Sequence, residues 1–167
     1  DASSTSVGSI DSAGSVSTTA GFAIISYTGT GSAETIAHGL GATPGLIITK
    51  KRNTTDSWFF WNKSFSATQY LSMDTTNAVG TASTVFGTLP TSTVYSTGGG
   101  GGTGTNGGTY ISYLFAEKQG YSKFSSYTGN GSADGTFTYT GFKPAFVIIK
   151  RSDGAANWEL YDSKRLG

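Results

Sequence analysis

The chain has 167 residues, a formal net charge of +1, 13% charged residues and no cysteine. This composition excludes disulfide scaffolds and Cys-ligated metal sites, and it disfavours a basic nucleic-acid-binding domain. Ser, Thr and Gly together supply 74 residues, while aromatic residues reach 13%. No stretch approaches the roughly 20 apolar residues of a membrane helix. We therefore expect an all-β protein that neither binds nucleic acid nor inserts into a membrane.

Residues 1–20 consist mostly of Ser, Thr, Gly and Ala and contain no aromatic or basic residue. Such a segment offers few apolar side chains to a core. We interpret it as an extended linker or as an arm added to a neighbouring subunit.

Apolar runs of strand length follow, separated by turn-forming residues. They are Phe22–Tyr27, Leu46–Ile48, Trp58–Trp61, Tyr70–Met73, Val85–Phe86, Val94–Tyr95, Tyr110–Ala116, Phe124–Tyr127, Phe137–Tyr139, Phe146–Ile149 and Trp158–Tyr161. Short strands with this spacing predict an antiparallel β-sandwich, which we expect to be jelly-roll-like. The unbroken runs at 46–48, 110–116 and 146–149 are typical of central strands.

An internal repeat is the sharpest feature of the sequence. Ser26–Glu34 matches Ser126–Asp134, and the match continues without a gap, so that 26–64 and 126–164 are identical at 12 of 39 positions. Chance would give about two or three identities at ordinary residue frequencies. The repeat unit is about 100 residues long, and Asn, Asp and Gly at 51–57 and 151–157 predict a hairpin turn in each copy.

The repeat divides the chain into a sandwich unit at 21–119 and a partial second unit at 120–167. The second unit covers less than one period. Either it belongs to a longer parent polypeptide, which we favour, or its strands pack onto the first unit and complete that sandwich.

Catalytic and metal-binding patterns are weak in this sequence. A Ser-His-Asp site would have to use His38, but the repeat places Thr138 at the equivalent position. The acidic residues show no spacing that suggests a glycosidase pair. Oxygen side chains at 130–134 resemble the beginning of a calcium loop, although a tight turn explains them better. We predict no catalytic residue, metal or cofactor.

Three features are candidates for ligand contact. The four aromatic residues at 58–61 are either core residues or a stacking platform for sugars. The basic residues at 50–52 either keep a strand end soluble or bind anionic glycans. The Gly-rich stretch at 98–108 predicts a long flexible loop, or an adaptable tip that contacts a receptor. The candidate ligand-binding residues are Lys51, Arg52, Trp58, Trp61, Gly100 and Asn106.

Several of these motifs resemble an uncharacterised repeat domain of virion and tail proteins of tailed bacteriophages, common in phages of cyanobacteria and other marine bacteria. The resemblance is carried by SYTGNGSADGTFTYTGFKPAFVIIKRSDGAANWELYDSKR at 126–165, GGTYISYLFAE at 107–117, HGLGATPGLIITKKR at 38–52 and SWFFWNKSF at 57–65. It covers about residues 21–165, and it implies no catalytic residues.

The resemblance implies a non-enzymatic structural protein of the virion, located in the tail or on the particle surface. We expect a tail fibre or tail adhesin segment that contributes to host attachment, with capsid decoration or another appendage as the alternative. Its partners would be other virion proteins, further copies of itself, with a trimer favoured, and a host surface glycan or protein. A carbohydrate-binding module of a secreted protein is the rival class, and a polysaccharide-degrading enzyme is a weaker one.

Overall fold

The computed structural model describes residues 6–100 and 102–165. These residues form strands β1 to β11 and contain no helix that could span a membrane. The strands are β1 (Ser12–Ser17), β2 (Phe22–Thr28), β3 (Ala33–Ala37), β4 (Leu46–Lys51), β5 (Trp58–Asn62), β6 (Gln69–Ser72), β7 (Gly80–Thr81), β8 (Val94–Gly98), β9 (Thr109–Phe115), β10 (Phe146–Lys150) and β11 (Trp158–Asp162). The prediction of an all-β class is confirmed.

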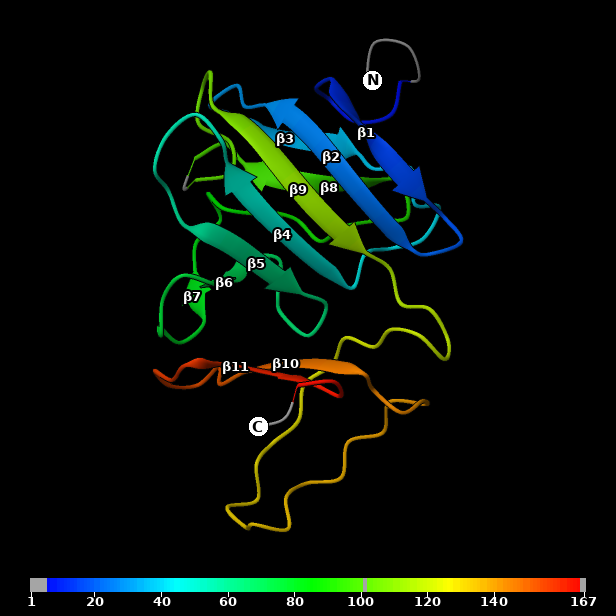
Figure 1. Cartoon of the computed structure of the whole chain (residues 1–167). Coiled ribbons are helices and arrows are strands. Elements are labelled where there is room, and N and C mark those ends of the chain that lie inside the picture. Colours follow the sequence, from blue (N-terminus) through cyan, green and yellow to red (C-terminus); the bar gives the residue numbers. More distant parts are fainter. Residues whose placement is uncertain (1–5, 101, 166–167) are drawn as a thin grey trace.

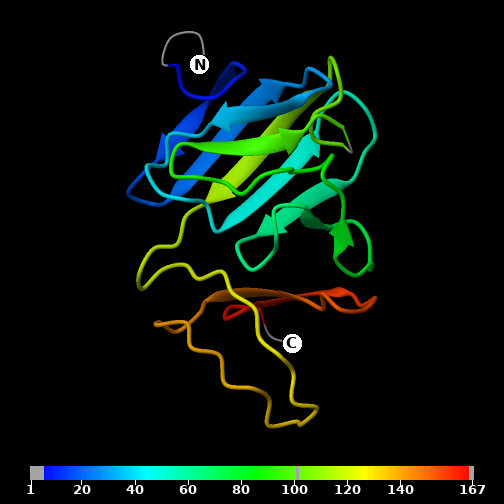
Figure 2. The same ribbon diagram turned by 180° about the vertical axis from the view of Figure 1, so that it is seen from behind.

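The main body consists of a large sheet and a short ladder. The seven-stranded sheet has the order β1-β2-β9-β4-β5-β6-β7, and every pair in it is antiparallel. The second layer is the antiparallel pair of β3 and β8, which lies across one face of the large sheet (Figures 1 and 2). Strand β9 joins the halves of the large sheet, because it pairs with β2 on one edge and with β4 on the other.

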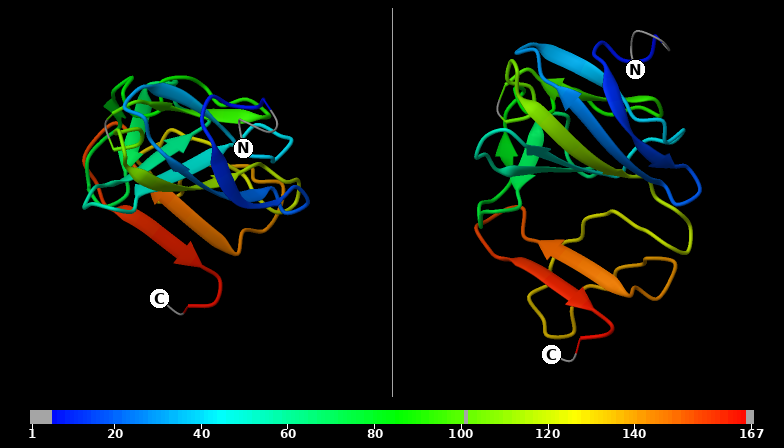
Figure 3. Two further views of the ribbon diagram at one scale, coloured as in Figure 1. Left: turned by 90° about the horizontal axis from the view of Figure 1, so that it is seen from above. Right: turned by 45° about the horizontal axis from the view of Figure 1, so that its top comes forward.

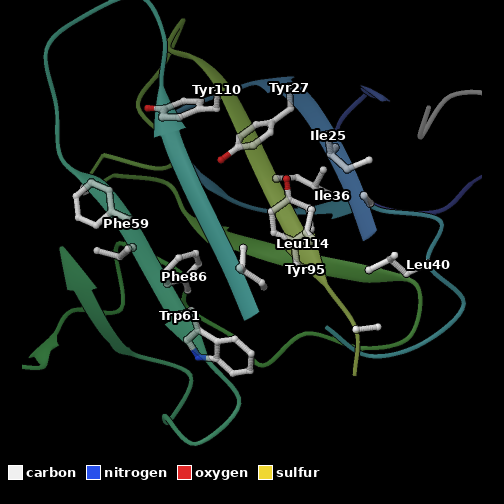
Figure 4. Close-up of a cluster of buried hydrophobic side chains, with 14 residues drawn as sticks. Ile25, Tyr27, Ile36, Leu40, Phe59, Trp61, Phe86, Tyr95, Tyr110 and Leu114 are labelled. Carbon is white, nitrogen blue, oxygen red and sulfur yellow. The ribbon is translucent and has the colours of Figure 1, made fainter. Parts of the chain in front are cut away.

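The core fills the space between these two layers. Alternate residues of β2 and β9 point inward, as the two-residue period of a strand requires. Figure 4 shows Tyr27 between Tyr110 of the same sheet and Tyr95 of the ladder. The rings of Tyr27 and Tyr110 stack with centroids 5.0 Å apart, and the rings of Tyr27 and Tyr95 meet edge-on with centroids 6.3 Å apart. These buried aromatic residues make the main body sandwich-like.

The Gly-rich stretch packs against the core, although the sequence predicted a flexible loop. Gly102, Thr103 and Gly104 are buried, and the Tyr27 hydroxyl donates to the carbonyl of Thr103 at 2.7 Å. A Cβ atom at Gly102 would lie 2.1 Å from the ring of Phe59. Glycine is needed here because the backbone passes too close to its neighbours for a side chain. Position 101 lies outside the described residues.

The N-terminal segment takes part in the sheet, although the sequence predicted a linker or arm. Strand β1 forms the edge of the large sheet and pairs with β2 from Ser12↔Tyr27 to Ser17↔Phe22. Backbone pairing therefore holds a segment that brings few apolar side chains. Residues 1–5 lie outside the described residues.

The C-terminal region, described from 120 to 165, contains one hairpin within those residues, β10–β11, which packs against the main body near β5 and β6. The Trp158 ring meets Phe60 edge-on with centroids 5.1 Å apart, and its Nε1 donates to the carbonyl of Ser72 at 3.3 Å. The amides of Val79 and Ala156 add backbone bonds between the two regions.

The hairpins predicted at 51–57 and 151–157 are confirmed, but several other strand predictions are wrong. Residues 123–145 form no strand, although runs at 124–127 and 137–139 were predicted. Strand β10 was predicted to be central, yet it pairs only with β11 among the described strands. The run at 85–86 is buried in a turn.

Candidate functional site

An open groove of about 990 Å³ lies on the main body beside the N-terminal segment. One wall is formed by residues 8–13, and the opposite side by the turn at 28–30 and the segment at 106–110. Two of the six residues predicted from the sequence, Arg52 and Asn106, line this groove. The structure thus brings together side chains that are far apart in the sequence.

The hydrogen bonds of Asn53 fix the end of the groove that contains Arg52. The Asn53 side chain donates from Nδ2 to the carbonyl of Gly107 at 3.2 Å and accepts from the amide of Thr109 at 3.2 Å. The backbone amide of Arg52 donates to the carbonyl of Thr109 at 2.7 Å. These bonds join the β4–β5 turn to the segment before β9, and so hold Arg52 near Asn106.

A carboxylate and two hydroxyl groups connect the walls at the other end. Glu34 accepts hydrogen bonds from the hydroxyls of Ser9 and Thr30, the latter at 2.7 Å. The amide of Thr35 donates to the Ser9 hydroxyl at 2.8 Å. The bonds from Ser9 and then Thr30 stabilise the ionised carboxylate and lower the pKa of Glu34.

The residues that line the groove thus supply the Arg52 guanidinium group, the Asp11 carboxylate, a side-chain amide and several Ser and Thr hydroxyls. Such a surface can donate and accept hydrogen bonds with a polar ligand such as a sugar chain. The described residues hold no cluster of three or more His, Asp or Glu side chains placed to bind a metal ion.

Trp58 and Lys51 lie outside this groove. Trp58 is 38% exposed on the outer face of the large sheet, where its ring stacks on Tyr113 with centroids 6.4 Å apart. The Nζ atom of Lys50 lies 5.7 Å from the centre of the same indole ring. Lys51 is partly buried at the end of β4. Trp58 therefore belongs to a separate aromatic surface.

Two other predicted residues are placed where they cannot contact a ligand through an exposed side chain. Trp61 is only 3% exposed, and its Nε1 donates to the carbonyl of Ser66 at 3.1 Å. Gly100 follows β8, where its amide donates to the carbonyl of Thr84 at 3.2 Å. Both residues serve packing and backbone pairing in this structure.

His38 is buried and its two ring nitrogens contact the backbone. Nδ1 accepts from the amide of Leu40 at 3.1 Å, and Nε2 lies 3.2 Å from the carbonyl of Thr91. This pattern requires the neutral ring with its proton on Nε2. Burial lowers the pKa of His38, although the bond to Thr91 opposes the change. The imidazole ring thus ties the end of β3 to the segment before β8.

The segment at 130–134 folds as a tight turn held by its own side chains. Asn130 accepts from the amide of Ser132 at 3.0 Å and donates to the carbonyl of Asp134 at 3.1 Å. This geometry is that of an Asx turn.

Sequence reasoning did not find Asn53, Ser9 or Glu34. Asn53 was interpreted only as a turn residue, and Ser9 lies in the segment interpreted as a linker. Only the bonds between distant segments give these residues a role, and no local pattern could have indicated them.

A search of curated proteins and a search of solved structures found no match to this chain. A family model described as "Domain of unknown function (DUF7483)" matches residues 1–167. The chain, with its sandwich-like main body and attached C-terminal hairpin, therefore belongs to the DUF7483 family.

Proposed function

We propose that this chain is a non-enzymatic structural module of a phage virion, most simply a segment of a tail fibre or tail adhesin. Its task is to assemble with other copies and other virion proteins, and to hold a binding surface toward the host. The resemblance of its motifs to virion and tail proteins of tailed phages supports the virion location. Capsid decoration is the alternative location for the same assembly role.

The observation that carries the assembly role is the apolar surface of the C-terminal region. The exposed large hydrophobic side chains between 120 and 165 are Tyr121, Tyr127, Phe137, Tyr139, Phe146, Ile148, Leu160 and Tyr161. Many large apolar side chains exposed within one region of a folded protein often mark an interaction site. Such a surface suits a module that is covered by neighbouring chains, and we take a homotrimer as the simplest assembly.

The repeat is part of this proposal. Strands β10 and β11 pair from Phe146↔Asp162 to Lys150↔Trp158, and β4 and β5 pair from Leu46↔Asn62 to Lys50↔Trp58. The two registers agree at every position once 100 is added to the residue number. This agreement supports a second copy of the same unit, and the jelly-roll topology remains part of the same proposal.

Purified virions test the proposed function directly. Mass spectrometry of the particles should detect peptides of this chain, and light scattering of the isolated chain should give three times the mass of one 17.2 kDa chain. A chain missing from virions would contradict the virion role. A monomer at all concentrations would contradict the assembly role.

The groove favours a second candidate, a carbohydrate-binding module, because it joins Arg52 and Asn106 among hydroxyl groups. A glycan array with the monomeric chain tests this candidate. Arg52→Ala should reduce binding to acidic glycans at least tenfold, whereas Arg151→Ala, which removes an exposed arginine outside the groove, should leave it unchanged. Equal losses in both variants, or no binding by the parent chain, would reject this candidate.

A further inference from the structure

Both edges of strand β4 are occupied in the main body. Strand β4 pairs with β5 on one edge and with β9 on the other, from Leu46↔Phe115 to Lys51↔Tyr110. The β10–β11 hairpin repeats the first of these pairings in the same register. Among the described strands, however, none pairs with the second edge of β10, and Figure 3 shows no strand beside that edge.

The residues along this edge have the chemistry of a covered strand. Phe146–Ile149 is an uninterrupted apolar run, yet Phe146 is 55% exposed and Ile148 is 39% exposed. Proteins usually protect an exposed edge with charges, proline or a bulge, because unpaired N–H and C=O groups attract another strand. The apolar part of β10 carries none of these protections.

We infer that the open edge of β10 accepts an antiparallel strand that has the side-chain pattern of β9. The inference deepens the proposed assembly role and rests on it. Strand β9 is an uncharged segment that alternates buried residues (Tyr110, Ser112, Leu114) with outward aromatic or aliphatic ones. An occupant of β10 that keeps the β4–β9 register would pair with Phe146–Arg151. Its backbone would supply the ladder bonds, and its side chains would cover the apolar positions, as in strand addition to a sheet edge.

One position distinguishes the occupant from β9 itself. In the main body, the hydroxyl of Thr49 lies 2.8 Å from the hydroxyl of its buried partner Ser112. The counterpart of Thr49 in β10 is Ile149, which has no hydroxyl group. A serine opposite Ile149 would lose its hydrogen-bond partner, and a buried polar group without a partner is costly. The occupant is therefore expected to carry alanine where β9 carries serine.

A synthetic peptide tests this inference. The peptide has the sequence of Thr109–Phe115 with flanking lysines for solubility, and a second version carries the S112A change. We expect saturable binding to the whole chain, with amide exchange at Phe146–Lys150 slowed at least tenfold. The S112A peptide should bind about five to ten times more tightly. No binding by either peptide would overturn the inference.

Two controls separate strand addition from simple apolar adhesion. N-methylation of alternate amides should abolish binding when the methyl groups lie on the edge that faces β10, and should leave it unchanged on the other edge. Equal binding by both methylated peptides would overturn the inference. So would a dimer whose mass in light scattering does not change when the peptide is added and whose amides at Phe146–Lys150 already exchange slowly without the peptide. None of these results would change whether the chain is found in virions, so the two proposals can fail separately.

Discussion

The same motifs occur twice in this chain with very different surroundings. In the main body Tyr27 is 5% exposed and Trp61 is 3% exposed, whereas their counterparts Tyr127 and Tyr161 are 51% and 57% exposed. Nevertheless, each region forms a hairpin with the same pairing. Local sequence is therefore enough to set the hairpin and its register, while burial depends on a strand that arrives from elsewhere in the fold.

That strand is β9 in the main body. It joins β2 to β4 and places Tyr110 and Leu114 in the core at 0% exposure. No such strand lies beside β10 in the described part of the chain. The segment at 123–145 consequently has no sheet to join, and this explains why motifs that form β2 and β3 in the first region form no strand in the second.

The largest difference between the regions is expected in the free energy of unfolding that is lost when the aromatic residue at 61 or at 161 is replaced by alanine. Trp61→Ala should lower the free energy of unfolding by about 3–5 kcal/mol, because it removes a buried ring and leaves a cavity. Tyr161→Ala should lower it by less than about 1 kcal/mol, because the ring is largely in water. Urea denaturation followed by circular dichroism measures both changes. Similar losses would show that Tyr161 is covered in solution.

The glycines at 29 and 129 give a smaller and more selective comparison. A Cβ atom at Gly29 would lie 2.7 Å from the backbone of Gly104, whereas a Cβ atom at Gly129 would meet nothing within 4 Å. Gly29→Ala should therefore cost about 1–3 kcal/mol through overpacking, and Gly129→Ala should be within about 0.5 kcal/mol of the parent. Thermal and urea denaturation provide the measurement. A large cost at Gly129 would mean that a neighbouring chain packs against this turn.

These comparisons also indicate which parts of the structure could be predicted. Both hairpins follow from apolar runs joined by Asn, Asp and Gly turns, which are short-range signals. Strand β1 could not be predicted, because a segment rich in Ser and Gly becomes a strand only by pairing with β2. The Gly-rich stretch was misinterpreted for a related reason. A high glycine content suggests a backbone with many accessible conformations. Here, however, the glycines allow the backbone to pack closely against Phe59 and neighbouring backbone.

The candidate site was predicted only in part. Arg52 and Asn106 were predicted as candidates because of their residue type, and both line the groove. Trp61 stood out for the same reason but points into the core. The face to which an aromatic residue in a strand points depends on the register, and register could not be read from four consecutive aromatic residues.

The smallest expected effect is a change in the pH dependence of stability, and it compares His38 with Thr138, the residue at the equivalent position of the repeat. Burial lowers the pKa of His38 below its usual value of 6.5, so the unfolded chain binds a proton more readily than the folded chain as the pH falls. The contribution of His38 to stability is thus fully present above about pH 6.5 and is lost as the pH falls through the folded-state pKa, with a slope of at most about 1.4 kcal/mol per pH unit. His38→Gln should remove this slope in urea denaturation between about pH 5 and 7. Thr138→His, which places an imidazole at the exposed counterpart, should add none. If the free energy of unfolding of His38→Gln kept the same slope against pH, the pH dependence would belong to other groups. The two regions would then not differ in this respect.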